Sequence, residues 1–256
     1  NGSADTAKNS GTINLGANGA TSKSLIGMYA KAEAGKKAGV KNSGTINVNT
    51  KDSVGMYAEI GSGATGTTTL DNKNQITVEQ EKSVGMFVKN NSNDEVSDGV
   101  FAVNDPDNRK TKDETIGVNK GTITINGGNG SVGMGADNGK ITNDKNTAPA
   151  APGKINVVGT KSAGMYGTNN SELINNGIIN VAATSVGSES IGMFINDKDS
   201  TIKNAGTINV GKHSYGIYGR KVNMTGGLID VDDDGVGVYS TGPNVSLSAG
   251  TINVAD

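Results

Sequence analysis

Apolar and polar residues alternate along short segments of this chain, and one such segment returns nine times. Each copy resembles Gly-Thr-Ile-Asn-Val, and its third position is always isoleucine: Ile13, Ile46, Ile76, Ile123, Ile155, Ile179, Ile208, Ile229 and Ile252. Alternation with period two predicts a β-strand with one buried face. Because successive copies begin 21 to 47 residues apart, the pattern predicts an all-β solenoid of about nine coils around one continuous core, with loop excursions between strands.

A second pattern, close to Ser-Val-Gly-Met-Tyr, follows each of the first eight strands. If both neighbours of its glycine point inward, six methionines form one core column: Met28, Met56, Met86, Met134, Met165 and Met193. The next position is aromatic in seven of the eight copies and should lie on the opposite, outer face. These rings form a candidate aromatic ladder of Tyr29, Tyr57, Phe87, Tyr166, Phe194, Tyr218 and Tyr239, which Gly135 interrupts.

Asparagine precedes most of the first strands at a fixed distance. Asn9, Asn42, Asn72, Asn119, Asn175 and Asn204 each lie two residues before the start of a copy. Asparagine and glycine tolerate turn conformations, so this spacing predicts a tight turn at one corner of every coil. Stacked asparagine amides can also hydrogen-bond along such a column. Each coil should then hold about three short strands and three bends.

Composition and charge exclude several classes of function. The 256 residues include Gly 39 and Cys 0, and the net charge is −2 with scattered lysines. This balance disfavours electrostatic binding of nucleic acid, and the lack of cysteine excludes disulfides and thiolate metal sites. We expect neither a cofactor nor a metal. The chain opens and closes within the repeat pattern, so we expect a single β-helix segment, 1–256, of a longer protein.

Three phrases carry a family resemblance: Lys-Asn-Ser-Gly-Thr-Ile-Asn-Val (41–48), Asp-Ser-Val-Gly-Met-Tyr-Ala (52–58) and Asn-Ala-Gly-Thr-Ile-Asn-Val (204–210). They resemble the passenger repeats of large fusobacterial autotransporter adhesins, over nearly the whole chain. The resemblance implies a right-handed parallel β-helix that a C-terminal outer-membrane barrel carries to the bacterial cell surface. It also implies attachment to a host-cell receptor or glycan, or to the surface of other bacteria.

The longest interruption of the repeats runs from Val88 to Glu114. Its polar and charged residues surround a small apolar group, and the candidate partner-binding residues are Asn91, Asp94, Glu95, Asp98, Phe101, Asp105, Asp107, Arg109 and Lys110. A long excursion of this kind is usually functional or disordered. It is either a protruding recognition loop or a tolerated insertion with no partner.

Shorter interruptions give weaker expectations. We expect a flexible loop over Ala58–Thr69, a detour over Thr142–Pro152 that replaces the asparagine turn, and a helical turn over Lys31–Lys37. The acidic run Asp230–Asp234 could suggest calcium, but calcium needs six to eight converging oxygens. A solvated acidic corner is the expected outcome.

Function therefore depends on surfaces rather than on a catalytic motif. The aromatic ladder could stack on sugars or on a partner protein, or its rings could simply cover the neighbouring glycines. Paired carboxylates along the columns, as polysaccharide-active β-helices need, are missing from the sequence pattern, so we do not expect an enzyme. Three readings remain: an adhesin that presents loops from a rigid rod, a stalk for a distal binding domain, and lateral self-association.

Overall fold

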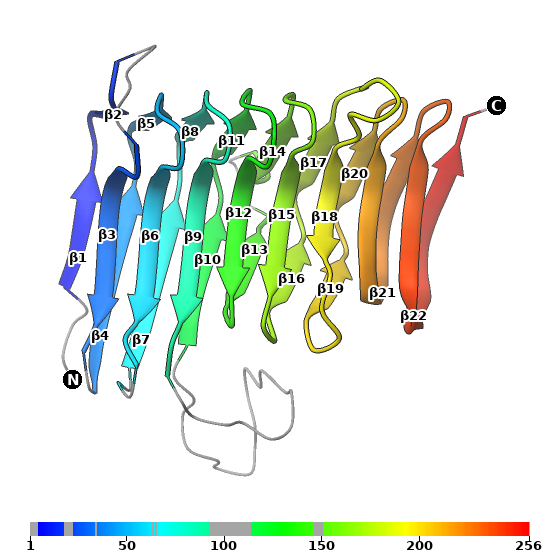
Figure 1. The fold of residues 1–256 in the computed structure, drawn as a ribbon. Helices are drawn as coiled ribbons and strands as arrows, with labels where there is room; N and C mark the ends of the chain where they lie inside the picture. Colours follow the sequence, from blue (N-terminus) through cyan, green and yellow to red (C-terminus); the bar gives the residue numbers. More distant parts are fainter. Residues whose placement is uncertain are drawn as a thin grey trace, which may run out of the picture.

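The computed structural model describes residues 5–17, 23–33, 35–62, 64, 66–92, 114–145 and 151–255. Every regular element among them is a β-strand, and each strand pairs in parallel with a strand of the next coil. The strands form three faces of a prism (Figure 1). In Figure 1 the coils advance from the N-terminus at the left, with β3, β6 and β9 running downward in front and β1 running upward. The fold is the expected right-handed parallel β-helix.

Face 1 contains the strands that end in the turn asparagines. They are β1 (Asp5–Asn9), β4 (Lys36–Asn42), β7 (Gly66–Asn72), β10 (Glu114–Asn119), β13 (Lys140–Asn143), β16 (Glu172–Asn175), β19 (Thr201–Asn204) and the central parts, 221–224 and 244–247, of β21 (Tyr215–Val231) and β22 (Val236–Val254).

Face 2 contains the nine repeated isoleucine strands. They are β2 (Thr12–Leu15), β5 (Thr45–Val48), β8 (Gln75–Val78), β11 (Thr122–Ile125), β14 (Lys154–Val157), β17 (Ile178–Val181), β20 (Thr207–Val210) and the ends, 228–231 and 251–254, of β21 and β22. All nine isoleucines are in register, as predicted.

Face 3 contains the glycine-methionine strands. They are β3 (Ile26–Ala32), β6 (Val54–Ile60), β9 (Val84–Asn90), β12 (Val132–Asp137), β15 (Ala163–Thr168), β18 (Ile191–Ile195) and the first parts, 215–219 and 236–240, of β21 and β22. The six methionines lie in one column here and are buried. They meet the isoleucines of face 2 in a core that runs through all the coils.

The glycine bend corrects one expectation. The residue before the glycine is half-buried on the outer side at Val54, Val84 and Val132, rather than in the core, and only Ala163 among these eight residues is buried. The glycine itself faces the core, and a Cβ added at Gly55 would lie 2.7 Å from the Gly85 carbonyl oxygen of the next coil. Because glycine has no Cβ, the coils can approach at this point, and the strand turns its next residue, methionine, inward as well.

The first corner, between faces 1 and 2, is held by a ladder of seven asparagines. Each of the first six donates from its amide Nδ2 to the Oδ1 of the asparagine in the next coil at 2.8 or 2.9 Å, in the order Asn9, Asn42, Asn72, Asn119, Asn143, Asn175 and Asn204. Asn143 corrects the expected detour, because the turn asparagine is present and the excursion begins after it. The ladder ends where Met224 follows Asn204 in register.

Several expected loops are strands instead. Lys31 belongs to β3, and Lys36 and Lys37 belong to β4, so most of the expected helical turn is strand. Most of the expected loop over Ala58–Thr69 belongs to β6 and β7. Face 1 strands share no sequence phrase, so hydrogen bonding to the neighbouring coils, rather than a local pattern, defines them.

Candidate interaction surface

The expected recognition loop is shorter than predicted. Val88 is a fully buried core residue of β9, and Glu114 begins β10, so the excursion between these strands covers residues 91–113. Of the candidate residues, only Asn91 is described, and its backbone N–H donates to the Ile60 carbonyl at 3.0 Å. The other candidates lie outside the described residues: Asp94, Glu95, Asp98, Phe101, Asp105, Asp107, Arg109 and Lys110.

The strands on either side of this excursion keep their places in the stack. β9 pairs with β6 before it and with β12 after it, and β10 pairs with β7 and β13. The asparagine ladder also continues across, with Asn72 Nδ2 donating to Asn119 Oδ1 at 2.8 Å. The coil therefore accommodates an insertion at this corner without a break in its ladders.

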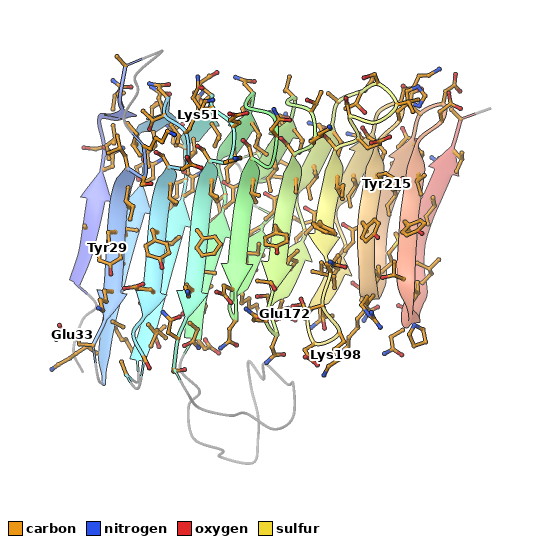
Figure 2. All side chains as sticks on the ribbon, in the orientation of Figure 1. Tyr29, Glu33, Lys51, Glu172, Lys198 and Tyr215 are labelled. Carbon is orange, nitrogen blue, oxygen red and sulfur yellow. The ribbon has the colours of Figure 1, made fainter. Side chains whose placement is uncertain are left out.

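The seven aromatic residues lie in one column on the outer side of face 3. Ring centroids are 5.6 Å apart for Tyr29–Tyr57, 5.9 Å for Tyr57–Phe87 and 4.9 Å for Tyr218–Tyr239, and each of these pairs is stacked. Figure 2 shows the rings in a row across the front of the molecule, with Tyr29 near its N-terminal end. Neighbouring rings in these three pairs are nearly parallel, with interplanar angles of 14° to 25°.

Gly135 leaves a gap in this column that its neighbour partly fills. A Cβ at Gly135 would lie 2.6 Å from Cδ2 of Phe87, so the Phe87 ring leans over the glycine. Beyond the gap, Tyr166 and Phe194 are tilted at 5.6 Å, and Tyr215 adds an eighth ring at 6.2 Å from Tyr218. The sequence pattern did not assign Tyr215 to the outer face, because it occupies the position before glycine.

Glu59 accepts hydrogen bonds from two ladder tyrosines. Tyr29 Oη donates to Oε1 at 2.5 Å and Tyr57 Oη donates to Oε2 at 2.9 Å, while Lys31 Nζ lies 3.7 Å from Oε1. Partial burial opposes ionisation of Glu59, but the two hydrogen bonds and the charges of Lys31 and Lys89 outweigh it and lower its pKa. Burial, followed by the bond to Glu59, raises the pKa of Tyr29 to about 12, and the same causes raise the pKa of Tyr57. The neutral tyrosines therefore hold an ionised carboxylate.

Charged residues of alternating sign flank the rings. Lys31, Glu59, Lys89 and Asp137 are in register on four successive strands. Lys89 Nζ lies 3.6 Å from Asp137, and the column continues with Thr168. The outer side of face 3 thus carries an apolar column, an aromatic column and a charged column, side by side.

Two grooves lie on the other faces. One, of about 520 Å³, crosses the outer side of face 1 between Glu172 and β22. The Glu172 side chain is 6% exposed and pairs with Lys140 at 3.2 Å and with Lys203. Asp199 also lines the groove and pairs with Lys198 at 3.1 Å. Figure 2 places Glu172 and Lys198 toward the lower corner. The sequence did not single out Glu172, because its burial depends on lysines from the coils before and after it.

The second groove, of about 700 Å³, follows the outer side of face 2 beside a second amide ladder. Asn209 Nδ2 donates to Asn180 Oδ1 at 2.7 Å, and Asn180 Nδ2 donates to Asn156 Oδ1 at 2.8 Å. Asp230 and Asp232 line its far end. Within the described part of the chain, no three His, Cys, Asp or Glu residues are placed to hold a metal ion, and no helix is long and apolar enough to cross a membrane.

A column of buried serines holds the second corner, between faces 2 and 3. Ser83, Ser131 and Ser190 donate from Oγ to carbonyl oxygens of the preceding coil at 2.8 to 2.9 Å. The serine is part of the repeated Ser-Val-Gly phrase, and that repetition was the signal for a structural role.

Comparison with known proteins does not identify a function for these surfaces. The sequence matches no protein-family model, and neither the curated proteins nor the solved structures gave a match.

Proposed function

We propose that this chain is a segment of a bacterial cell-surface adhesin, a rigid β-helical rod that presents loops to a host-cell receptor or glycan, or to the surface of other bacteria. The observation that carries the proposal is the 91–113 excursion between β9 and β10, which leaves the ladders on both sides in register. A scaffold that tolerates such an insertion can vary its loops without losing its core. The resemblance of the repeats to autotransporter passengers supports the same reading.

The rod also suits this task mechanically. Each coil contacts only its neighbours. Three hydrogen-bonded faces connect every coil to the next, and the asparagine ladder adds a connection from the first coil to the seventh. A binding loop on such a rod stays at a fixed height along its axis. We propose no catalytic role, because the two carboxylates of the face 1 groove, Glu172 and Asp199, are both ion-paired with lysines.

The test is binding of the purified chain to epithelial cells and to other bacteria. In the informative variant, a six-residue Gly-Ser linker replaces residues 93–113, while Asn91 keeps its hydrogen bond to Ile60. A matched control keeps the length and composition of 93–113 but scrambles its order. Binding by the native chain alone, with the β signal in circular dichroism unchanged in all three, supports the proposal.

The stalk is the second candidate, and the same experiment separates it. If no version binds any cell, the segment acts as a spacer and recognition lies elsewhere. If the scrambled and native chains bind equally, the loop sequence is not the site, and the adhesive surface must lie on the coil itself.

A further inference from the structure

The outer side of face 3 carries an apolar stripe over eight strands, and Gly135 interrupts its aromatic column. Its first column is the residue before each glycine, and its second column is the aromatic ladder. The rings of the interior strands are half-buried, and Ile26, Tyr29 and Tyr239 are 48%, 47% and 46% exposed on the first and last strands, which have a neighbour on one side only. A patch of this length on a soluble surface marks an interaction site, and aromatic residues are enriched at protein interfaces.

We propose that this stripe is a homotypic interface, on which a second copy of the chain packs with its coil axis antiparallel. A second copy of the chain would be one partner in the adhesive function proposed above, and the biological role of the interface rests on that function. Dimerisation itself can be measured on the purified chain, without any cell-binding assay. Two features of the stripe favour this occupant: the spacing and mutual stacking of the rings, and the signs of the flanking charges.

The rings favour a protein partner over a sugar. A sugar stacks on an open aromatic face, but Tyr29, Tyr57 and Phe87 cover one another's faces at interplanar angles of 14° and 21°. The hydroxyls of Tyr29 and Tyr57 are also occupied by Glu59. The rings repeat with the strand spacing of about 4.8 Å. A second copy repeats with the same spacing, so its side chains can interdigitate at every coil.

The charged column selects the antiparallel direction. Complete overlap in this direction places β6 opposite β21 of the second copy, and therefore Glu59 opposite Arg220, which follows Tyr218 by two residues. Lys89 then faces Asn196, and Asp137 faces Thr168, so no like charges meet. With parallel coil axes, a face-to-face pair instead sets the charged column of each copy against the apolar column of the other, and burial of charge against apolar surface is costly.

The size of the stripe predicts a weak complex. Eight strands about 4.8 Å apart and three outward positions per strand give about 34 Å by about 14 Å. This is about 500 Å² for each copy, below the ~800 Å² per partner of a standard interface. We therefore expect self-association that appears at high protein concentration, or where many copies share one surface.

Sedimentation equilibrium of the purified chain tests the interface. Val84→Lys places a charge in the middle of the stripe and should weaken dimerisation about tenfold or more. Thr45→Lys is the matched control, because Lys154 occupies the equivalent outward position on face 2. Native and Thr45→Lys chains that dimerise equally, with Val84→Lys monomeric, support the proposal. A native chain that stays monomeric, or a Val84→Lys chain that dimerises normally, overturns it.

Cross-linking tests the direction, and the cysteine-free sequence makes each introduced thiol unique. In the antiparallel pair, Thr168 lies one coil from its counterpart, whereas the two copies of Lys31 lie about 34 Å apart along the axis. A short bis-maleimide should therefore join Thr168→Cys chains and leave Lys31→Cys chains single. Cross-linking of Lys31→Cys chains contradicts the antiparallel register, and cross-linking of neither variant indicates a parallel pair or association elsewhere. Either result overturns the proposal without bearing on cell binding by residues 93–113.

Discussion

At the scale of single residues, the turn asparagines are the polar groups that the core depends on most. Six of the seven are buried, and each connects two coils through its amide. A buried amide that loses its partner bears the full cost of desolvation, whereas an exposed amide exchanges its partner for water. The two asparagine ladders of this molecule differ in this respect.

Asn119→Ala tests the buried ladder. It removes the acceptor of Asn72 and the donor to Asn143, and should lower the free energy of unfolding by about 2–3 kcal/mol. Asn180→Ala, in the ladder on the outer side of face 2, is the control and should cost about 0.5 kcal/mol or less. Urea unfolding followed by circular dichroism measures both. Equal costs would show that burial does not distinguish the ladders.

Glu59 should make stability depend on pH in the acid range. Its pKa is lowered in the folded chain, so its contribution is present above the unfolded pKa of about 4.3 and is lost as pH falls through the folded pKa. The stability difference between the native chain and Glu59→Gln should therefore shrink as pH falls from 7 toward 3. Urea unfolding at a series of pH values measures it.

Tyr57→Phe provides the second variant for this prediction. It removes one of the two hydrogen bonds that favour the Glu59 carboxylate, so the loss of stability should begin at a higher pH than in the native chain. If the unfolding free energy depends on pH identically in the native chain, Glu59→Gln and Tyr57→Phe, other carboxylates cause that dependence.

At the scale of the element, the glycine bend sets the spacing between coils on face 3. A Cβ at Gly133 would lie 2.7 Å from the Gly164 carbonyl oxygen and 3.1 Å from Ile125 Cδ1 and Ile155 Cγ2. Backbone of the next coil occupies this space, so a side chain there must push two coils apart. The glycine is required for close approach, rather than for an unusual φ.

Gly133→Ala should therefore lower the unfolding free energy by about 1–3 kcal/mol through overpacking. Gly61→Ala is its control, because the nearest atom to that Cβ is Lys31 Cε at 3.5 Å. The control should leave stability unchanged or raise it slightly, since alanine narrows the unfolded ensemble. Thermal unfolding measures the stability of both variants. A Gly133→Ala chain as stable as the native chain would contradict the close approach of the coils.

At the scale of the whole molecule, stability comes from contacts between neighbouring coils. Of the two described residues of the 91–113 excursion, Asn91 and Ser92, Asn91 donates a backbone hydrogen bond to the preceding coil. A shorter connection also costs slightly less entropy to close. Replacement of residues 93–113 by the Gly-Ser linker should therefore leave the thermal midpoint unchanged or slightly higher.

Ile123→Ala is the matched positive control for this replacement. Ile123 is fully buried on the central strand β11, and its truncation should cost about 3 kcal/mol. A linker variant that unfolds as readily as Ile123→Ala would show that residues 93–113 pack on the coil.

The sequence by itself determined the repeat and its register. The isoleucine, methionine and aromatic positions recur together because each coil repeats the same two short strands. The sequence therefore predicted the isoleucine strands of face 2 and the columns of the core directly. The turn asparagines were readable for the same reason, except for Asn143. A ten-residue interval separates it from Gly153, so the local spacing that identified the others was lost.

Only the tertiary structure decided what depends on neighbouring coils. β4, β7 and β10 share no phrase and become strands because parallel partners on both sides satisfy their backbone groups. The direction of the residue before each glycine follows from the close approach of two coils, and the burial of Glu172 follows from Lys140 and Lys203. Period-two patterning describes one strand at a time, whereas these features arise between strands that are 21 or more residues apart along the chain.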